Sequence, residues 1–189
     1  MTMPAPLTYI ALLHFPVYDR NGRIVATAIT NLDIHDLARS TRTFGLAGYY
    51  VVTPLERQRE LATRIVGYWN EEEGPRAEAL KKVRIANELK DVIVEIEREH
   101  GRKPRVIATA ARKRNGARTI EYGEMRRQLA EKGERPTLLV FGTGWGLEET
   151  LIESCDGILE PIRGADEYNH LSVRSAAAII LDRLFGERQ

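Results

Sequence analysis

The sequence predicts an α/β domain with a mainly parallel sheet that is covered by helices on both faces. Short apolar runs, typical of buried strands, alternate along the chain with segments whose apolar residues recur at helical spacing. The length of 189 residues and a hydrophobic content of 43% suit a globular domain with a real core. No repeat, low-complexity tract or linker divides the sequence, so residues 1–189 are expected to form a single domain.

The first elements are expected to be two extended segments joined by a tight turn. Residues 7–14 read as an apolar strand, and residues 24–30 are rich in β-branched side chains. Asn21 and Gly22 lie between them, and this pair is a strong turn signal. The sequence therefore favours a hairpin or an extended arm near the N-terminal end.

A helix is expected to begin at Asp33, because its carboxylate can cap free N–H groups and Asp36 follows three residues on. Gly45 is expected to end this helix. Its buried stripe is expected to contain Ile34, Leu37, Ala38 and Thr41.

The same alternation continues through the middle of the chain. Residues 49–53 read as a buried strand, and Pro54 is expected at the first position of the helix that follows. Residues 83–86 are expected to form a short strand. Asn87 is then expected to cap a helix that Gly101 ends.

The second half of the chain is expected to supply three strands and three helices. The expected strands cover residues 104–109, 137–141 and 157–159, and the expected helices cover residues 121–130, 147–153 and 171–184. Open α/β sheets bind ligands at the carboxyl ends of their strands. The loops after Thr109, Phe141 and Leu159 are therefore the expected location of a site.

The segment FGTGWGLEE, residues 141–149, places glycines at alternate positions directly after an apolar run. A P-loop would need Lys followed by Ser or Thr, whereas Leu147, Glu148 and Glu149 follow here. A dinucleotide-binding fold would place G-x-G-x-x-G after the first strand of its βαβ unit. A tight strand-to-helix turn, with glycine chosen for its conformational freedom, remains open as an explanation without a ligand.

Three segments together resemble the SPOUT superfamily, the trefoil-knot RNA methyltransferases. NLDIHDLARSTRTFG, residues 31–45, is similar to the family's Asn-x-Gly-x-x-x-Arg helix that ends in Phe-Gly, with Arg39 as the motif arginine. Residues 142–147 are similar to its glycine-rich turn, which a strand ending near proline follows. YNHLSVRSAAAIILDRL, residues 168–184, is similar to the turn before its last helix. The resemblance is strongest to small stand-alone bacterial proteins described as RNA or tRNA (guanine-N1) methyltransferases.

The resemblance implies that the cofactor is S-adenosylmethionine (SAM), with S-adenosylhomocysteine as its product. It also implies a deep C-terminal trefoil knot, an RNA substrate (tRNA in particular), no metal, and a homodimer in which a second subunit completes each site. The chain departs from the family pattern at several positions. The second motif often carries Glu between its glycines, where this chain has Thr143 and Trp145. Asp33 and His35 stand where the first motif often has Asn and Gly, and Ser172 stands where Asn is common.

The resemblance also implies roles for individual residues. Arg39 is the first catalytic candidate, because a guanidinium can bind phosphate or stabilise developing negative charge. The general base that takes the proton from guanine N1 is expected among Asp166, Glu167 and His170. The residues expected to bind the cofactor are Thr109, Phe141, Gly142, Thr143, Gly144, Gly146, Leu147, Ile162, Asn169, Leu171 and Ser172. The residues expected to bind RNA are Arg42, Arg112, Lys113, Arg114 and Arg118.

Several alternatives stay open at this point. The basic residues and loop acids can be ordinary solvated surface, and the apolar residues near the glycines can be ordinary core. Ribose 2′-O methylation fits the first motif and its arginine about as well as guanine N1 methylation does. A non-catalytic SAM-binding protein associated with RNA or ribosomes would keep the same fold. A nucleotide-binding oxidoreductase is a more distant alternative.

Composition limits the other classes of function. The net charge of +1 gives no argument for nucleic-acid binding by the whole molecule, so RNA binding would depend on a local basic patch. Cys155 is alone, which excludes a disulfide framework or a zinc cluster built on cysteines. No signal-peptide pattern is visible, and no apolar run reaches the roughly 18 residues that a membrane span needs. We therefore expect a cytoplasmic protein without a membrane segment.

Overall fold

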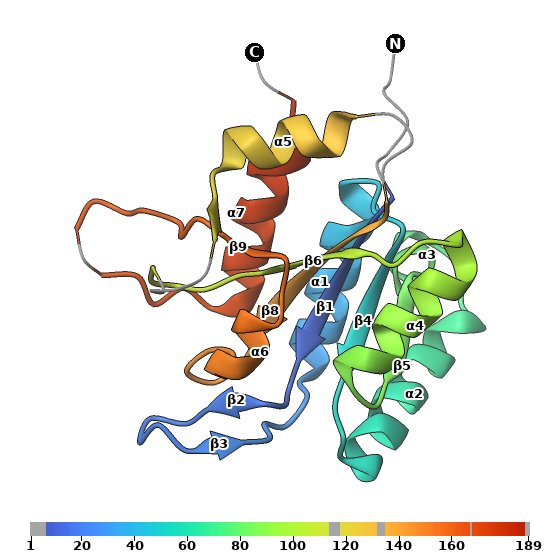
Figure 1. Cartoon of the computed structure of the whole chain (residues 1–189). Helices are drawn as coiled ribbons and strands as arrows, with labels where there is room; N and C mark the ends of the chain where they lie inside the picture. Colours follow the sequence, from blue (N-terminus) through green and yellow to red (C-terminus); the bar gives the residue numbers. More distant parts are fainter. Residues whose placement is uncertain (1–6, 114–117, 132–134, 167, 188–189) are drawn as a thin grey trace.

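A computed structural model of the chain describes residues 7–113, 118–131, 135–166 and 168–187 (Figure 1). Its centre is a seven-stranded sheet in the order β5-β4-β1-β8-β6-β9-β7, and its neighbouring strands are parallel. A separate antiparallel hairpin pairs β2 with β3. The predicted α/β fold with a mainly parallel sheet is thus confirmed.

The strands are β1 Thr8–Leu13, β2 Val17–Tyr18, β3 Ile24–Val25, β4 Gly48–Val52, β5 Val83–Ala86, β6 Arg105–Ala108, β7 Thr119–Ile120, β8 Thr137–Gly142 and β9 Gly157–Leu159. The helices are α1 Asn31–Thr43, α2 Glu56–Asn70, α3 Pro75–Leu80, α4 Leu89–His100, α5 Tyr122–Ala130, α6 Glu149–Glu153 and α7 Val173–Phe185. The alternation of strands and helices therefore follows the sequence pattern throughout.

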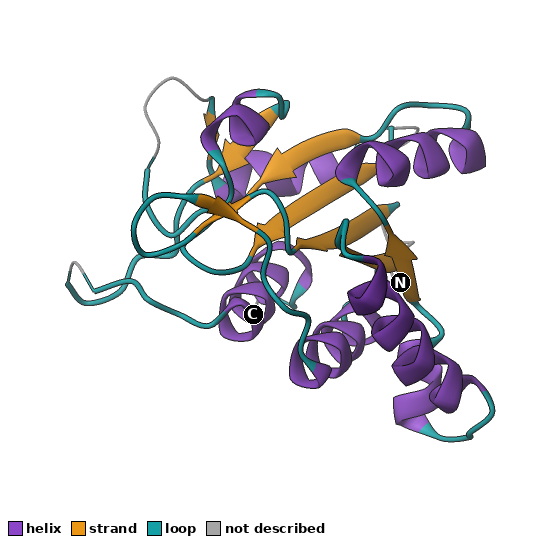
Figure 2. Ribbon diagram, turned by 90° about the horizontal axis from the view of Figure 1, so that it is seen from below, coloured by secondary structure: helices purple, strands orange, loops and turns teal. Residues whose placement is uncertain are grey.

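Helices cover both faces of the sheet, as the view in Figure 2 shows. Because side chains alternate along a strand, β1 contributes to both cores. Ile10 and Leu12 pack on one face with α1, α2, α3, α5 and α7. Tyr9, Ala11 and Leu13 pack on the other face with α4, α6 and the hairpin. These two apolar layers fix the sheet between the helices and so hold the carboxyl ends of its strands in place.

Helix α1 begins at Asn31, two residues before the predicted start. The hydroxyl of Thr30 accepts a 3.0 Å hydrogen bond from the N–H of Asp33, so Thr30 caps the helix and the prediction of Asp33 as the cap is wrong. Gly45 follows the end of the helix with φ 68°, as predicted. The predicted stripe is confirmed, because the buried side chains include Ile34, Leu37, Ala38 and Thr41.

Other sequence-based boundaries differ from the structure in similar ways. Pro54 lies before α2 rather than at its first position, and Glu88 caps α4 in place of Asn87. Helix α3 is absent from the prediction because its sequence reads as a break, although its Pro is well suited to a first helical position. Strand β7 is too short to show a period. None of these differences changes the order of the main elements.

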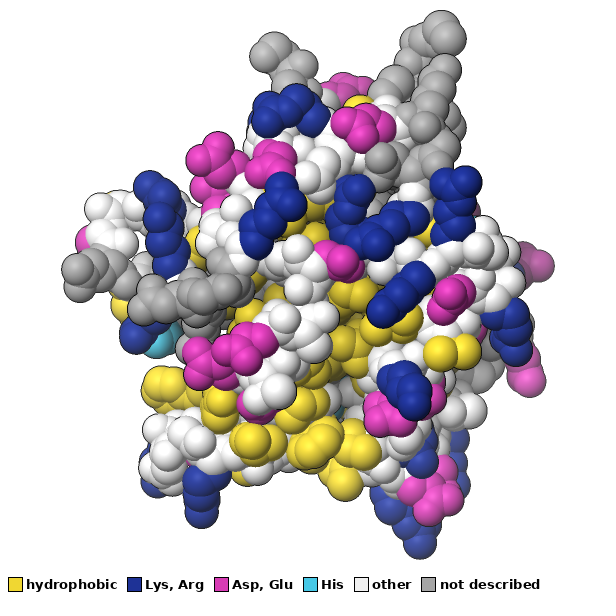
Figure 3. Space-filling view, viewed as in Figure 1, with side chains coloured by type: hydrophobic (Ala, Val, Ile, Leu, Met, Phe, Trp, Pro, Cys, Tyr) yellow, Lys and Arg dark blue, Asp and Glu magenta, His cyan; other side chains and the backbone are white. Residues whose placement is uncertain are grey.

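The surface seen in Figure 3 carries basic and acidic side chains that are intermixed, while hydrophobic side chains gather over the hairpin β2–β3. Phe15 and Ile24, at 41% and 53% exposed, are among the large apolar side chains left open to solvent. Within the described ranges, none of the helices combines the length and the apolar character that crossing a membrane requires.

Candidate active site

A cavity of 630 Å³ lies at the carboxyl ends of β6, β8 and β9. Its walls come from the loop that starts at Thr109, from the glycine-containing segment 142–146 and from the connection that leaves β9. The residues before and within the first turns of α7 complete it. This is the edge at which parallel α/β sheets bind ligands, and the volume is within the range of small-molecule sites.

The glycine segment forms a tight turn that only glycine permits. A Cβ on Gly142 would lie 2.9 Å from the Cγ of Leu147. Gly144 has φ 58°, and a Cβ there would lie 2.8 Å from the carbonyl oxygen of Tyr18. Gly146 has φ 107°. The turn therefore brings bare main chain to the cavity while Leu147, 2% exposed, enters the core beneath it.

The hairpin β2–β3 supports the outer side of this turn. Tyr18 donates its N–H to the carbonyl of Gly146 and accepts the N–H of Trp145, both at 2.9 Å. Thr143 donates its hydroxyl to the carbonyl of Leu13 at 3.1 Å, and its Oγ1 lies 2.5 Å from the Oγ1 of Thr27. Thr27 and Thr143 both line the cavity, so the hairpin shapes one wall of it.

Asn169 ties together the loops that close the other side. Its side-chain amide donates to the carbonyl of Ala111 at 2.6 Å and to the carbonyl of Ile162 at 2.8 Å. The segments after β6 and after β9 are thereby joined in front of α7. Ser172 then caps α7, because its hydroxyl accepts the N–H of Ser175 at 3.2 Å.

In the part of the chain that the structure describes, two carboxylates line the cavity, and both have partners. Asp33 accepts a 2.8 Å hydrogen bond from the guanidinium of Arg174, which also lies 3.5 Å from Asp36. Glu160 accepts the N–H of Tyr122 at 2.7 Å. These acids therefore hold helices in place, and neither is a free carboxylate facing a ligand.

His14 lies beneath the turn and is buried. Its Nδ1 is 3.0 Å from the hydroxyl of Thr27. Burial lowers the pKa of His14 to about 4, although the nearby carboxylate of Asp33 acts in the opposite direction. The imidazole is therefore neutral at physiological pH and serves as a hydrogen-bonding support for the threonine pair.

The structure brings most of the predicted cofactor residues together. All of them except Leu147 line the cavity, and Leu147 packs directly under Gly142. His170 also lines it, and its ring lies 5.2 Å from the ring of Tyr168 between centroids. Arg112 reaches the same cavity from the basic loop.

Other predicted residues lie elsewhere. Arg39 lines a separate cavity on the far side of α1 and does not reach the first one. Asp166 is exposed and accepts the N–H of Tyr168 at 2.8 Å. Arg42 and Arg118 form exposed ion pairs with Glu78 and Glu124, and Lys113 is exposed without lining either cavity. Glu167 and Arg114 fall outside the described residues.

Sequence reasoning missed several residues that line the cavity, among them Thr27, Thr30 and Glu160. They belong to no local motif, and Thr27 lies 116 residues from Thr143, which it contacts. The fold alone brings them together. A pattern read along the chain offers no signal for such a pairing.

The cavity suits the nucleoside part of SAM. Apolar side chains of Phe141, Ile162 and Leu171 offer a slot for a planar base, and backbone of the glycine turn is accessible beside it. The positions of Gly142 and Gly144 admit no Cβ without a clash. No group of three potential metal ligands occurs among the described residues.

Comparison with known proteins supports this assignment. The profile of a family described as SAM-dependent RNA methyltransferase matches residues 7–186. The chain belongs to this family. It is 47% identical to a protein of Oleidesulfovibrio alaskensis named "tRNA (guanine-N(1)-)-methyltransferase", over 97% of this chain but only 43% of that protein. It is 44% identical to an uncharacterized protein of Aquifex aeolicus, over 96% of this chain and 89% of that protein.

Solved structures share the fold. A probable methyltransferase from Bordetella pertussis superposes with a TM-score of 0.64 at 16% identity, covering 95% of this chain and 94% of that one. The SpoU methyltransferase AviRb from Streptomyces viridochromogenes, solved with AdoMet, gives 0.57 at 15% identity, covering 97% and 61%. The predicted membership of a SAM-dependent RNA methyltransferase family is thus confirmed, and SAM is the cofactor of that family.

Proposed function

We propose that the chain transfers the methyl group of SAM to tRNA, at N1 of guanine. The observation that carries this proposal is the cavity at the carboxyl ends of β6, β8 and β9, where a glycine turn exposes main chain beside apolar side chains. Two curated relatives at 47% and 46% identity bear the name of that activity. The cytoplasm, where tRNA is modified in bacteria, is its proposed location.

Those relatives are longer than this chain, so their name does not by itself assign the activity to it. The chain spans 43% of the length of each, so more than half of either protein has no counterpart here. The named activity can reside in either part. The assignment of guanine N1 therefore depends on the chemistry of this cavity and on a test with this chain alone.

When bound, SAM supplies an electrophilic methyl group on a sulfonium. The chain then has to orient the target atom in line with that methyl group and to accept a proton. Of the predicted proton acceptors in the described residues, His170 lines the cavity and Asp166 does not. We assign acceptance of the guanine N1 proton to the imidazole of His170, because histidine is the side chain that most often acts as a general base.

Two exposed aromatic rings flank His170 and are suited to hold the target base. Trp145 is 62% exposed and Tyr168 is 73% exposed. The ring of His170 lies 6.4 Å and 5.2 Å from theirs between centroids. An unstacked base can bind by stacking on such rings. Arg112 and Lys113, both exposed in the adjoining loop, supply positive charge for neighbouring phosphates.

Arg39 requires a second subunit if it acts in catalysis. It projects from α1 on the side away from the SAM cavity of its own chain. In the proposed homodimer, Arg39 of one subunit faces the cavity of the other, where its guanidinium stabilises charge on the target nucleotide. The predicted catalytic role of Arg39 therefore requires the homodimer, and a monomeric protein would exclude that role.

One observation favours ribose 2′-O methylation as a second candidate. Among the described residues, the carboxylates that line the cavity are those of Asp33 and Glu160, and both are engaged in hydrogen bonds within the protein. A site for guanine N1 needs a group that removes the ring proton, whereas a ribose hydroxyl can be activated beside a guanidinium. The two candidates predict different products from the same reaction.

Nucleoside mass spectrometry separates the candidates. The purified chain is incubated with unmodified tRNA transcripts and methyl-deuterated SAM, and the digested RNA is analysed. We expect deuterated 1-methylguanosine, and its loss in a His170→Ala variant. A deuterated 2′-O-methyl nucleoside as the only product would select the second candidate. No transfer to any RNA, with SAM bound, would identify a non-catalytic SAM-binding protein.

A further inference from the structure

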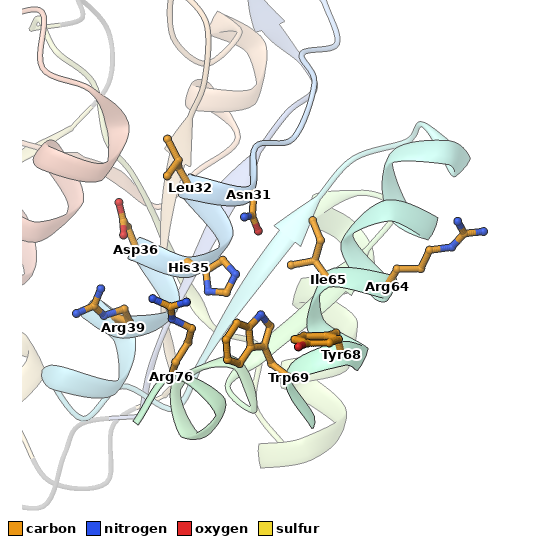
Figure 4. Close-up of a pocket in the computed structure, with 10 residues that line it drawn as sticks. All are labelled: Asn31, Leu32, His35, Asp36, Arg39, Arg64, Ile65, Tyr68, Trp69 and Arg76. Carbon is orange, nitrogen blue, oxygen red and sulfur yellow. The ribbon is translucent and has the colours of Figure 1, made fainter. Parts of the chain in front are cut away.

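A second cavity, of 510 Å³, lies between α1 and α2 on the opposite side of α1 from the SAM cavity (Figure 4). The residues that line it are Asn31, Leu32, His35, Asp36, Arg39, Arg64, Ile65, Tyr68, Trp69 and Arg76. Both cavities border the start of α1, because Thr30 lines the first and the next residue, Asn31, lines the second. A ligand as long as RNA can therefore occupy both.

Aromatic rings form the floor of this second cavity. The rings of Tyr68 and Trp69 lie 5.4 Å apart between centroids, and the imidazole of His35 lies 5.5 Å from the indole at 86°. Figure 4 shows the His35 and Trp69 rings next to each other between the helices. Tyr68 is 64% exposed, although a large aromatic side chain usually finds apolar cover. A flat, accessible ring of this kind is suited to stacking on a nucleobase.

The charge around the cavity is positive. Arg39, Arg64 and Arg76 have no acidic partner within ion-pair distance among the described residues. Asp36 is the carboxylate that lines the cavity, and it lies 3.5 Å from Arg174. The guanidinium of Arg76 lies over the indole of Trp69, 5.0 Å from its centroid. The cavity thus combines unpaired guanidinium groups with stacking surfaces, which suits a phosphate-bearing ligand.

His35 adds an unused hydrogen-bonding atom. Its Nδ1 is buried and has no hydrogen-bond partner in the part of the chain that the structure describes. Burial, together with the charge of Arg76, lowers the pKa of His35, so the ring stays neutral. A neutral imidazole can donate to or accept from the edge of a base, and an unpartnered buried nitrogen is costly unless a ligand uses it.

We propose that this second cavity binds an unstacked nucleotide of the RNA substrate, next to the one presented to the SAM cavity. Its base lies against Tyr68 and Trp69, and its phosphate contacts Arg64 and Arg76. The proposal rests on the proposed function insofar as RNA is the substrate. A second copy of the chain is not the occupant. In the proposed homodimer only Arg39, at one end of this cavity, is directed to the partner's SAM cavity, and a symmetric contact through the end that holds Arg64 and Tyr68 would oppose arginines to one another.

The test measures RNA binding apart from methyl transfer. Fluorescein-labelled bulk tRNA and fragmented ribosomal RNA are titrated with the wild type, Tyr68→Ala, Arg64→Ala and the control Arg98→Ala. Arg98 is exposed on α4, which packs on the other face of the sheet. SAM affinity, measured by calorimetry, verifies that each variant is folded and keeps its cofactor site.

Tyr68→Ala is expected to weaken binding of at least one RNA by about fivefold or more. Arg64→Ala is expected to reduce the slope of log K against log salt by about 0.7, the share of a single phosphate contact. Arg98→Ala is expected to change neither. Affinities for both RNAs that equal those of the wild type in Tyr68→Ala and Arg64→Ala would overturn the proposal, as would a wild type that binds neither RNA.

The outcomes also separate this proposal from the proposed function. A wild type that binds RNA through Tyr68 but transfers no methyl group refutes the proposed function and supports the second site. Methyl transfer by the wild type, together with unchanged RNA affinity in both variants, supports the proposed function and refutes the second site. If Tyr68→Ala leaves RNA binding intact but dissociates a dimer in light scattering, the face is a protein interface and the nucleotide site is refuted.

Discussion

The guanidinium of Arg174 donates a 2.8 Å hydrogen bond to the carboxylate of Asp33, although the two residues are 141 positions apart. The pair joins the first turn of α7 to the first turn of α1. The side chain of Asp33 is only 9% exposed, and it lines the proposed SAM cavity. The contact therefore sets the position of the two helices that border the proposed cofactor site.

Removal of Arg174 is expected to destabilise the protein. In Arg174→Ala the buried carboxylate of Asp33 loses its charged partner, which lowers the free energy of unfolding by about 3 kcal/mol. Urea denaturation followed by circular dichroism measures the change. Arg57→Ala, which removes an exposed arginine paired with Glu60 on α2, is the control and is expected to cost less than about 1 kcal/mol.

The double variant Arg174→Ala/Asp33→Asn separates the ion pair from other effects of the arginine. The neutral amide no longer leaves a buried charge, so the double variant is expected to be more stable than Arg174→Ala alone. Equal or additive losses would mean that Arg174 stabilises the protein through packing rather than through Asp33.

Gly144→Ala is expected to weaken SAM binding by about tenfold or more while the protein stays folded. The backbone at φ 58° disfavours a side chain, and the added Cβ would meet the carbonyl oxygen of Tyr18 at 2.8 Å, so the turn has to shift. Calorimetric titration with SAM measures the effect. Gly67→Ala is the matched control, because a Cβ there has nothing within 4 Å and alanine favours the helix. Wild-type SAM affinity in Gly144→Ala would exclude the turn from the cofactor site.

Sequence patterns predict the strands of the sheet well, because a buried parallel strand reads as a short apolar run. Residues 137–141 form such a run, and β8 occupies them. The glycine turn can also be recognised from the sequence, because its residues are consecutive in the chain. Helix starts are less reliable, since Asp33 has the side chain of a cap but is instead buried against Arg174. Only the tertiary structure distinguishes these two roles.

The rest of the site could not be read along the chain. Thr27 and Glu160 join the cavity because the hairpin is hydrogen-bonded to the turn after β8 and because β9 pairs with β6. Arg39 fits a motif, yet the motif does not reveal that the side chain faces away from its own SAM cavity. The trefoil knot stays a prediction, and residues 114–117 of the loop after β6 lie outside the described residues.

The buried His14 predicts a loss of stability in acid. Burial lowers its folded-state pKa from 6.5 to about 4, so the unfolded chain binds a proton that the folded protein does not. The free energy of unfolding is not reduced by His14 above pH 6.5. Between pH 6 and pH 4, protonation of His14 in the unfolded chain lowers it by about 1.4 kcal/mol for each pH unit. His14→Gln removes this titration, so urea denaturation of both proteins across that range is expected to show a shallower decline in the variant. Parallel declines would mean that His14 is protonated in the folded state.

Arg39→Ala is expected to lower methyl transfer by about 100-fold or more and to leave SAM affinity unchanged, because Arg39 does not line the SAM cavity. If Arg39 acts across a dimer, coexpression with Gly144→Ala chains restores activity. Each mixed dimer then holds one intact cofactor turn opposite one intact arginine, and random pairing gives about a quarter of wild-type turnover. Dimers of each variant alone supply the baseline in the same assay. Mixed dimers that stay at this baseline would place Arg39 in its own subunit's chemistry or outside catalysis.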